Sequence, residues 1–122
     1  MTAIAWAARI ALVLVFARAL YGAINPHHDH AASAPPPDVV EHVMYGYLLT
    51  LLTIAAIPRL SPWLVGAGFL AIGVGFEATQ LLGLVSGTAQ WPDLAANVAG
   101  VAAALAPFAL ARQRISTRPD RL

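Results

Sequence analysis

The segment WLVGAGFLAIGVGFEATQLLGLV, residues 63–85, decides the class of this protein. Its only charged side chain is Glu77, and the rest is apolar or small apart from Thr79 and Gln80. A helix needs about 20 consecutive, mostly apolar residues to cross a hydrocarbon core of roughly 30 Å. Residues 63–85 are therefore predicted to form a helix that spans a membrane.

Three further segments meet the same criterion, and they are residues 3–24, 39–57 and 93–111. The connections between the four segments are short or rich in Pro, Ser and Gly, as loops usually are, and comprise residues 25–38, 58–62 and 86–92. Residues 112–122 are predicted to form a polar tail. The sequence thus predicts an all-α fold, a single domain over residues 1–122 that forms a bundle of four transmembrane helices.

The composition agrees with lipid as the solvent of this chain. Hydrophobic residues make up 59% of its 122 residues and charged residues only 11%, with a mean hydropathy of +0.70. Soluble domains carry about 25% charged residues, so a soluble chain this short would lack the polar surface it needs. The chain has no cysteine, which excludes disulfides, a thiolate nucleophile and a cysteine-based metal site.

The arginines predict the orientation in the membrane. All seven basic residues are arginines, and Arg59 lies in the 58–62 loop while the tail carries Arg112, Arg114, Arg118 and Arg121. The other two loops hold no Arg or Lys. Because cytoplasmic loops are enriched in basic residues, both termini are expected in the cytoplasm. The expected location is the bacterial cytoplasmic (inner) membrane, with several passes through it.

A signal peptide is the competing interpretation of the N-terminus. Residues 1–19 end in Ala17-Arg18-Ala19, which resembles a small-residue cleavage site. The stretch lacks a positively charged beginning, however, and its apolar character continues past that site. We therefore expect it to be retained as the first helix, with Arg9 as an anchor near the cytoplasmic end.

Polar side chains inside membrane spans are costly and are functional candidates by default. Apart from Arg9, those of this chain that we take as candidates fall toward the predicted outer half of the spans, although the helices alternate in direction. The candidate ligand-binding residues are Arg18, Asp38, His42, Glu77, Gln80, Asp93 and Asn97. Glu77, Asp93 and His42 are also the candidates for acid–base catalysis.

Helical phase places these residues on common faces, because positions i, i+3, i+4 and i+7 lie on one side of a helix. Glu77 shares a face with Gly66 and Gly73, and Asn97 shares one with Gly100 and Ala104. Small residues let helices approach closely in lipid. The pattern predicts a polar pocket that opens outward and is closed toward the cytoplasm by small residues.

The run Glu77-x-x-Gln80, a loop, and then Asp93-x-x-x-Asn97-x-x-Gly100 resembles the signature of VanZ-like membrane proteins. Asp38-x-x-x-His42 is similar to that family's preceding block. The chain departs from the family where Val39 and Ala104 replace a common lysine and glycine, and where residues 86–92 lack an arginine. The resemblance implies a bacterial envelope protein and a link to resistance against the glycopeptide teicoplanin, without implying a reaction.

Structural interpretations of the same residues stay open. Glu77 and Asp93 are equally suited to fixing helix register through pairs with Arg18 and Asn97, because a paired charge is tolerated in lipid. Asp93 follows Pro92 and is placed to act as an N-cap. His42 suits a proton shuttle or a packed hydrogen-bonding role.

Metal binding has only a weak sequence signal. His27, His28 and His30 are adjacent ligand-type residues, but their spacing does not match a dedicated zinc site. We therefore expect no metal site and no cofactor. A nucleic-acid partner is not expected either.

Two functional hypotheses follow. In the first, the pocket binds the head group of a membrane lipid or a lipid-linked envelope intermediate, with Arg18 engaging an anionic group. In the second, the chain is a small enzyme that acts on an envelope lipid through Glu77, Asp93 and His42, although no strong nucleophile or metal signature supports it. A proton-coupled transporter is the weakest reading, since one small bundle would have to form a homo-oligomer. The sequence favours the first hypothesis and leaves the enzyme question open.

Overall fold

The computed structural model describes residues 2–24, 37–85 and 87–116, with Asp38 placed by its backbone alone. It contains four helices in the order α1 (Ala3–Ile24), α2 (Pro37–Ala56), α3 (Pro62–Leu81) and α4 (Trp91–Ser116). Each is long and apolar enough to cross a membrane. Within the described residues the fold is therefore all-α, which supports a multi-pass membrane protein.

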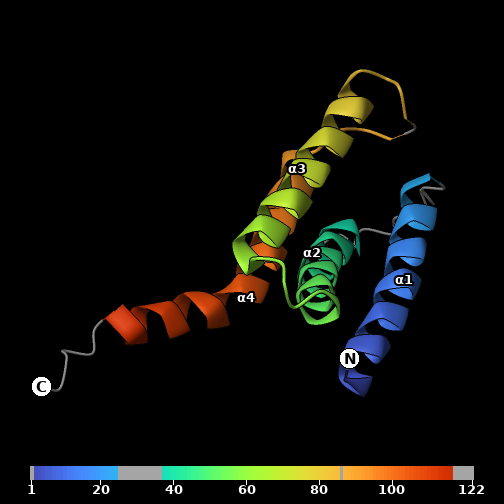
Figure 1. The fold of residues 1–122 in the computed structure, drawn as a ribbon. Helices are drawn as coiled ribbons and strands as arrows, with labels where there is room; N and C mark the ends of the chain where they lie inside the picture. The colour runs from blue at the N-terminus through green and yellow to red at the C-terminus, as the bar shows by residue number, and fades with distance from the viewer. Residues whose placement is uncertain (1, 25–36, 86, 117–122) are drawn as a thin grey trace, which may run out of the picture.

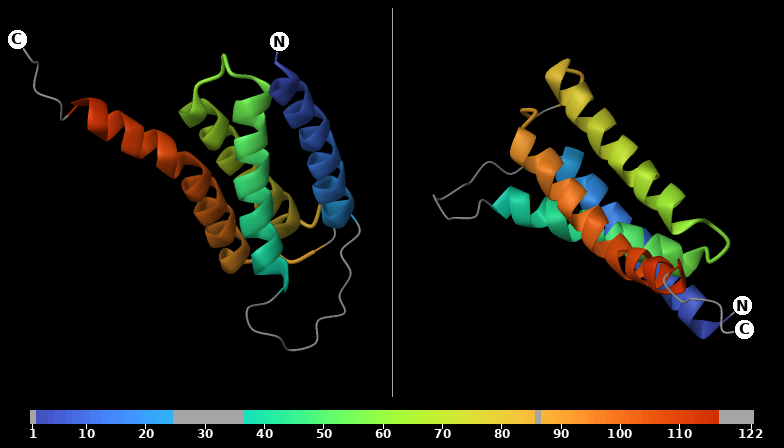
Figure 2. Two further views of the ribbon diagram at one scale, coloured as in Figure 1. Left: turned by 90° about the horizontal axis from the view of Figure 1, so that it is seen from below. Right: turned by 90° about the vertical axis from the view of Figure 1, so that its left-hand side faces the viewer.

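The helices alternate in direction. Figure 2 shows the start of α1, the turn between α2 and α3, and the far end of α4 toward one end of the bundle. The α3–α4 loop and the start of α2 lie at the opposite end. The alternation predicted from the sequence is thus confirmed, and it brings the polar ends of α2, α3 and α4 together.

Helices α2 and α4 form the centre of the bundle. They pack against each other most extensively, α3 packs against both, and α1 packs against α2 alone among the described helices. The buried side chains are mainly small, and include Ala56, Ala96, Val101 and Ala104. The bundle is therefore held by close approach of helix backbones, which is the usual way that helices associate in lipid.

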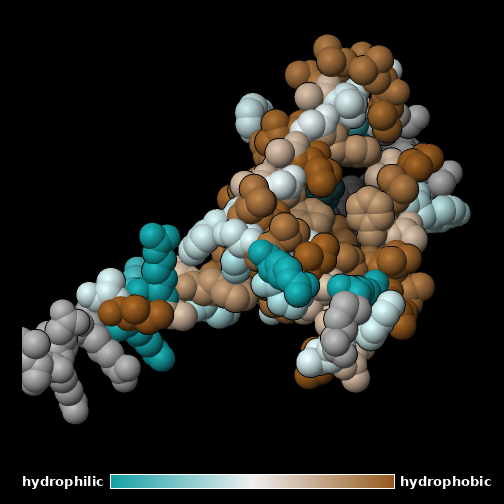
Figure 3. All heavy atoms as spheres, viewed as in Figure 1, coloured by the Kyte–Doolittle hydropathy of each residue, from teal (hydrophilic) through white to brown (hydrophobic). Residues whose placement is uncertain are grey.

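The outer surface of the bundle is apolar. Ile4, Leu81 and Trp91 are 76%, 78% and 84% exposed, an arrangement that water would penalise and lipid favours. Figure 3 shows hydrophobic residues over most of one face, with hydrophilic residues toward the C-terminal part of α4 and near the middle of the view. A hydrocarbon environment around the helices accounts for this surface.

Helix α3 ends four residues before the predicted boundary at residue 85. Gly83 has φ +70°, and the N–H groups of Gly83 and Leu84 donate to the carbonyl oxygens of Gln80 (3.0 Å) and Thr79 (2.9 Å). This is a Schellman motif, in which a left-handed residue, usually glycine, closes a helix. The predicted span was too long because hydropathy does not register this backbone signal.

Helix α4 is longer than predicted, since it begins at Trp91 and continues to Ser116. Residues 112–116 are thus helical, which corrects the prediction of a polar tail starting at residue 112; Arg and Gln are good helix formers. Pro107 lies inside the helix and has no N–H to donate, so it loosens the backbone there. Figure 1 shows α4 bending away from the bundle in its second half. Helix α2 also begins earlier than predicted, at Pro37, and ends one residue sooner, at Ala56.

Arg9 stabilises the end of the bundle where α1 begins. Its Nε donates a hydrogen bond of 3.1 Å to the carbonyl oxygen of Ala56, the last residue of α2. Its guanidinium also lies 5.2 Å from the centre of the Trp6 ring. The side chain therefore joins α1 to α2, a structural role in addition to that of an anchor near a membrane surface.

Candidate functional site

Three helices bring His42, Glu77 and Asp93 together near the end of the bundle that holds the α3–α4 loop. One nitrogen or carboxylate oxygen from each residue lies within 4.8 Å of the other two. We call these three residues the polar cluster. His42 comes from the second turn of α2, Glu77 from the last turns of α3 and Asp93 from the first turn of α4.

Asp93 is the most buried member of the polar cluster, with only 7% of the residue exposed. Its Oδ2 lies 3.5 Å from Nε2 of His42, across the contact between α4 and α2. Helix α4 begins at Trp91, so Asp93 occupies the third helical position and is not the N-cap, which corrects one interpretation of the sequence. A carboxylate in the first turn is still favoured by the helix dipole.

Glu77 joins α3 to the start of α4. Its Oε2 accepts a 2.9 Å hydrogen bond from the backbone N–H of Gln90, the residue before α4. The carbonyl oxygen of Gln90 in turn accepts the N–H groups of Asp93 (3.2 Å) and Leu94 (3.4 Å). Glu77 therefore satisfies a backbone donor at a helix end, and this bond holds its carboxylate beside Asp93.

Asn97 orients the imidazole of His42. Its Oδ1 lies 3.4 Å from Nδ1 of His42, one turn along α4 from Asp93. Because an amide oxygen only accepts hydrogen bonds, Nδ1 is the donor of this contact in the forms of His42 that carry a proton there. Nε2 then points to the carboxylate of Asp93.

Glycines make room for Asn97. A Cβ added to Gly73 of α3 would lie 3.1 Å from Nδ2 of Asn97, and one added to Gly46 of α2 would lie 2.9 Å from its backbone oxygen. The predicted small-residue face of α3 is thus confirmed at Gly73. The sequence analysis did not predict the role of Gly46, although its place one helical turn after His42 is a signal for a close approach there.

The other predicted binding residues lie outside the polar cluster. Gln80 is turned toward the α3–α4 loop, where its Nε2 would be 2.6 Å from a Cβ on Gly87. Arg18 is exposed on α1, and its guanidinium lies beside Gly22 of the same helix. The side chain of Asp38, as well as His27, His28 and His30, lies outside the described residues.

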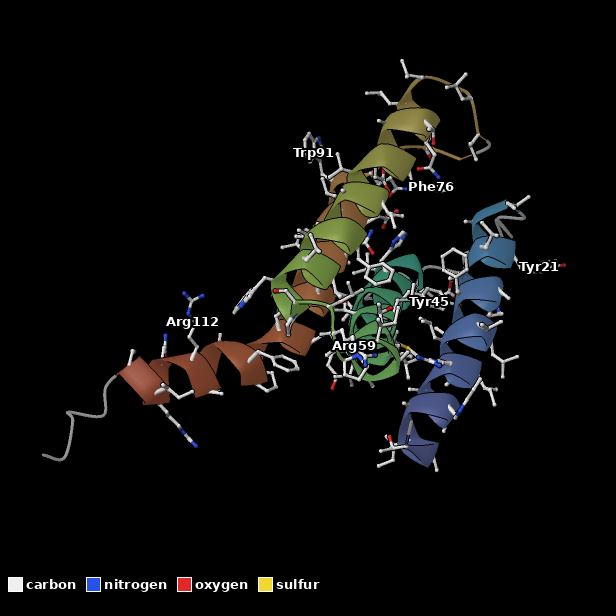
Figure 4. The ribbon with its side chains drawn as sticks, viewed as in Figure 1. Tyr21, Tyr45, Arg59, Phe76, Trp91 and Arg112 are labelled. Carbon is white, nitrogen blue, oxygen red and sulfur yellow. The ribbon has the colours of Figure 1, made fainter. Side chains whose placement is uncertain are left out.

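A groove of about 280 Å³ adjoins the polar cluster between α3 and the start of α4. Glu77 belongs to both the groove and the cluster, and Gln90 is the other residue of the groove with a polar side chain. The remaining lining residues are apolar: Val74, Ala78, Leu81, Ala89, Trp91 and Leu94. Figure 4 shows Trp91 at the flank of α3 and α4, far from Arg59 at the other end of the bundle. A ligand in the groove would therefore meet polar groups at Glu77 and Gln90 and apolar side chains elsewhere.

Comparison of the chain with protein-family models, with curated proteins and with solved structures finds no significant match. The VanZ-like resemblance consequently rests on the sequence pattern alone. The function has to be argued from the polar cluster and the groove.

Proposed function

We propose that this chain is a bacterial inner-membrane protein that binds a membrane amphiphile, with the head group at the polar cluster and part of an acyl chain in the adjoining groove. One observation supports this most strongly: Glu77 is shared by a cluster of hydrogen-bonding groups and a groove that is otherwise mostly apolar. An amphiphile presents the same two chemistries side by side. The volume of the groove is near the lower end for small-molecule sites.

The cluster selects for the chemistry of the head group. Glu77 and Asp93 offer carboxylates, which accept hydrogen bonds when ionised, whereas Arg18 is exposed on α1, which packs against neither α3 nor α4 in the described residues. We therefore propose a head group with hydroxyl or ammonium donors, in place of the anion that the sequence assigned to Arg18. Lipid-linked envelope intermediates that carry hydroxyl-rich groups belong to this class. This is also where the VanZ-like resemblance points, with teicoplanin resistance as one outcome of such binding.

Lipid retention tests the proposal. The chain is purified in a mild detergent, and the retained lipids are extracted and identified by mass spectrometry. We expect Glu77→Gln to lower retention of the enriched lipid about 10-fold, since a hydrogen bond to a charged group contributes about 1.5–3 kcal/mol. Ala78→Phe should lower it as well, because the larger side chain fills the groove without changing any charge.

Glu41→Gln is the matched control, because Glu41 is an exposed carboxylate on α2 that does not belong to the polar cluster. It should retain lipid as the wild type does. The proposal fails if the retained lipid has the composition of the bulk membrane in all four proteins.

An enzyme that acts on the same amphiphile is the second candidate. The 3.5 Å approach of His42 Nε2 to Asp93 Oδ2 favours it, because an imidazole beside a carboxylate is a common acid–base arrangement. Turnover of the lipid identified above would distinguish an enzyme from a binding protein. Loss of turnover in His42→Gln with lipid retention intact would assign the proton transfer to His42.

The proposed orientation places the polar cluster toward the outer side of the membrane. It rests on the arginines, because Arg59 belongs to the α2–α3 turn and Arg112 and Arg114 to the last part of α4, and Figure 2 shows both segments toward the end of the bundle where α1 begins. The cysteine-free chain makes a direct test simple. In intact cells, we expect an impermeant maleimide to label Thr88→Cys, in the α3–α4 loop, and to spare Ser61→Cys, in the α2–α3 turn. The reverse labelling pattern would invert the orientation.

A further inference from the structure

We propose that His42, Glu77 and Asp93 form a binding site for one divalent cation. The three side chains supply one imidazole and two carboxylates, and a ligand atom of each lies within 4.8 Å of the others. Metal–ligand bonds of about 2.0–2.2 Å need these atoms somewhat closer together. Rotation of the side chains is enough for such a movement, since His42 and Glu77 are only partly buried.

The orientation of His42 is the second observation that points to a cation. Its Nδ1 lies 3.4 Å from Asn97 Oδ1, which directs Nε2 toward Asp93 Oδ2 at 3.5 Å. A ligating histidine is commonly held through its other ring nitrogen in this way.

Charge gives the third argument. The two carboxylates carry two negative charges when ionised, which match the two positive charges of a divalent cation. A divalent cation balances both carboxylates and leaves the imidazole neutral, as metal binding requires.

The mixed ligand set indicates which cations fit. Imidazole suits zinc, iron and copper, whereas carboxylates suit magnesium, calcium and manganese. One imidazole with two carboxylates therefore favours a first-row divalent ion such as Zn²⁺ or Mn²⁺. The sequence carries no spacing signal for this site, because its ligands are thirty-five and sixteen positions apart and converge only when the three helices pack.

The cation site does not depend on the proposed lipid. A bound cation would, however, change how the lipid head group is held. Three protein ligands leave at least one coordination position open. If the proposed function holds, this position takes an oxygen atom of the head group. Lipid retention should then fall when the metal is removed with a chelator.

Metal titration of the purified full-length chain tests the proposal. After treatment with a chelator, the protein in detergent is titrated with Zn²⁺ alone and with Mn²⁺ alone. We expect one ion per chain, and at least 100-fold weaker binding in Asp93→Asn and in Glu77→Gln, given that loss of even an outer partner costs 10- to 100-fold. Glu41→Gln should bind as the wild type does.

A second control addresses the histidines outside the described residues. The triple variant His27→Gln, His28→Gln and His30→Gln should keep the affinity of the wild type. If a variant of the polar cluster does not fold, the wild type can still test the cation site. Pulsed EPR of Mn²⁺ bound to the wild type should show coupling to one imidazole nitrogen.

Three results would overturn the cation site: no saturable binding, affinity unchanged in Asp93→Asn, or affinity lost in the triple variant. These outcomes are separable from failure of the proposed function. A chain that retains lipid after metal removal and binds no cation contradicts only the cation site. A chain that binds the cation and retains no specific lipid contradicts only the lipid proposal.

Discussion

Replacing Gly100 by alanine is expected to destabilise the bundle strongly, although it adds only one methyl group. A Cβ at this position would overlap the carbonyl oxygen of Val43 and lie 2.8 Å from the backbone nitrogen of Tyr47. Both atoms belong to the backbone of α2, which cannot rotate away as a side chain can. The two central helices would have to separate.

We expect Gly100→Ala to lower the free energy of unfolding by about 1–3 kcal/mol or more, the range for overpacking of a tight interior. Thermal unfolding in detergent, followed by circular dichroism, measures the change. Gly68→Ala is the control, since a Cβ on Gly68 would meet no atom of another described helix within 4 Å, and alanine is the better helix former there. Equal midpoints for the two variants would show that α2 and α4 do not approach at Gly100.

Removing the charge of Asp93 or Glu77 is expected to have a large effect on the phenotype of a host that expresses the chain. Where the wild type raises survival under envelope stress or teicoplanin, we expect Asp93→Asn and Glu77→Gln to abolish that protection. Both exchanges keep the shape of the side chain and remove the charge that the head group or a cation would meet. Growth across a concentration series measures the effect, with membrane levels checked by blot.

The control for this experiment is again Glu41→Gln, which should protect as the wild type does. Protection that persists in Asp93→Asn at normal protein levels would exclude the polar cluster from the function. If the protein levels of both variants collapse together with the protection, the cluster is mainly structural. A wild type that protects against no envelope stress or glycopeptide would remove the resistance part of the proposal while leaving the lipid-retention experiment to decide binding.

The site could be predicted from the sequence only in part. Helical phase identified Glu77, Asp93, Asn97 and His42 as residues of inward faces, because a polar side chain in an apolar span stands out. The same reasoning gave Arg18 and Gln80 equal weight, although the structure places Arg18 beside Gly22 and Gln80 against Gly87. Phase determines the side of a helix on which a residue lies, but it does not determine which neighbouring helix packs there.

The sequence by itself determined the class of this protein, the number of its helices and their alternating direction, since these depend on apolar length and on local loop signals. Even the early end of α3 was encoded locally, in Gly83. Only the tertiary structure decided that α2, α3 and α4 bring His42, Glu77 and Asp93 within 4.8 Å while α1 stays at the edge. The physical reason is that close packing depends on glycines of different helices, such as Gly46, Gly73 and Gly100, meeting at one depth. This shared depth depends on how the helices pack together, so it cannot be derived from any single segment.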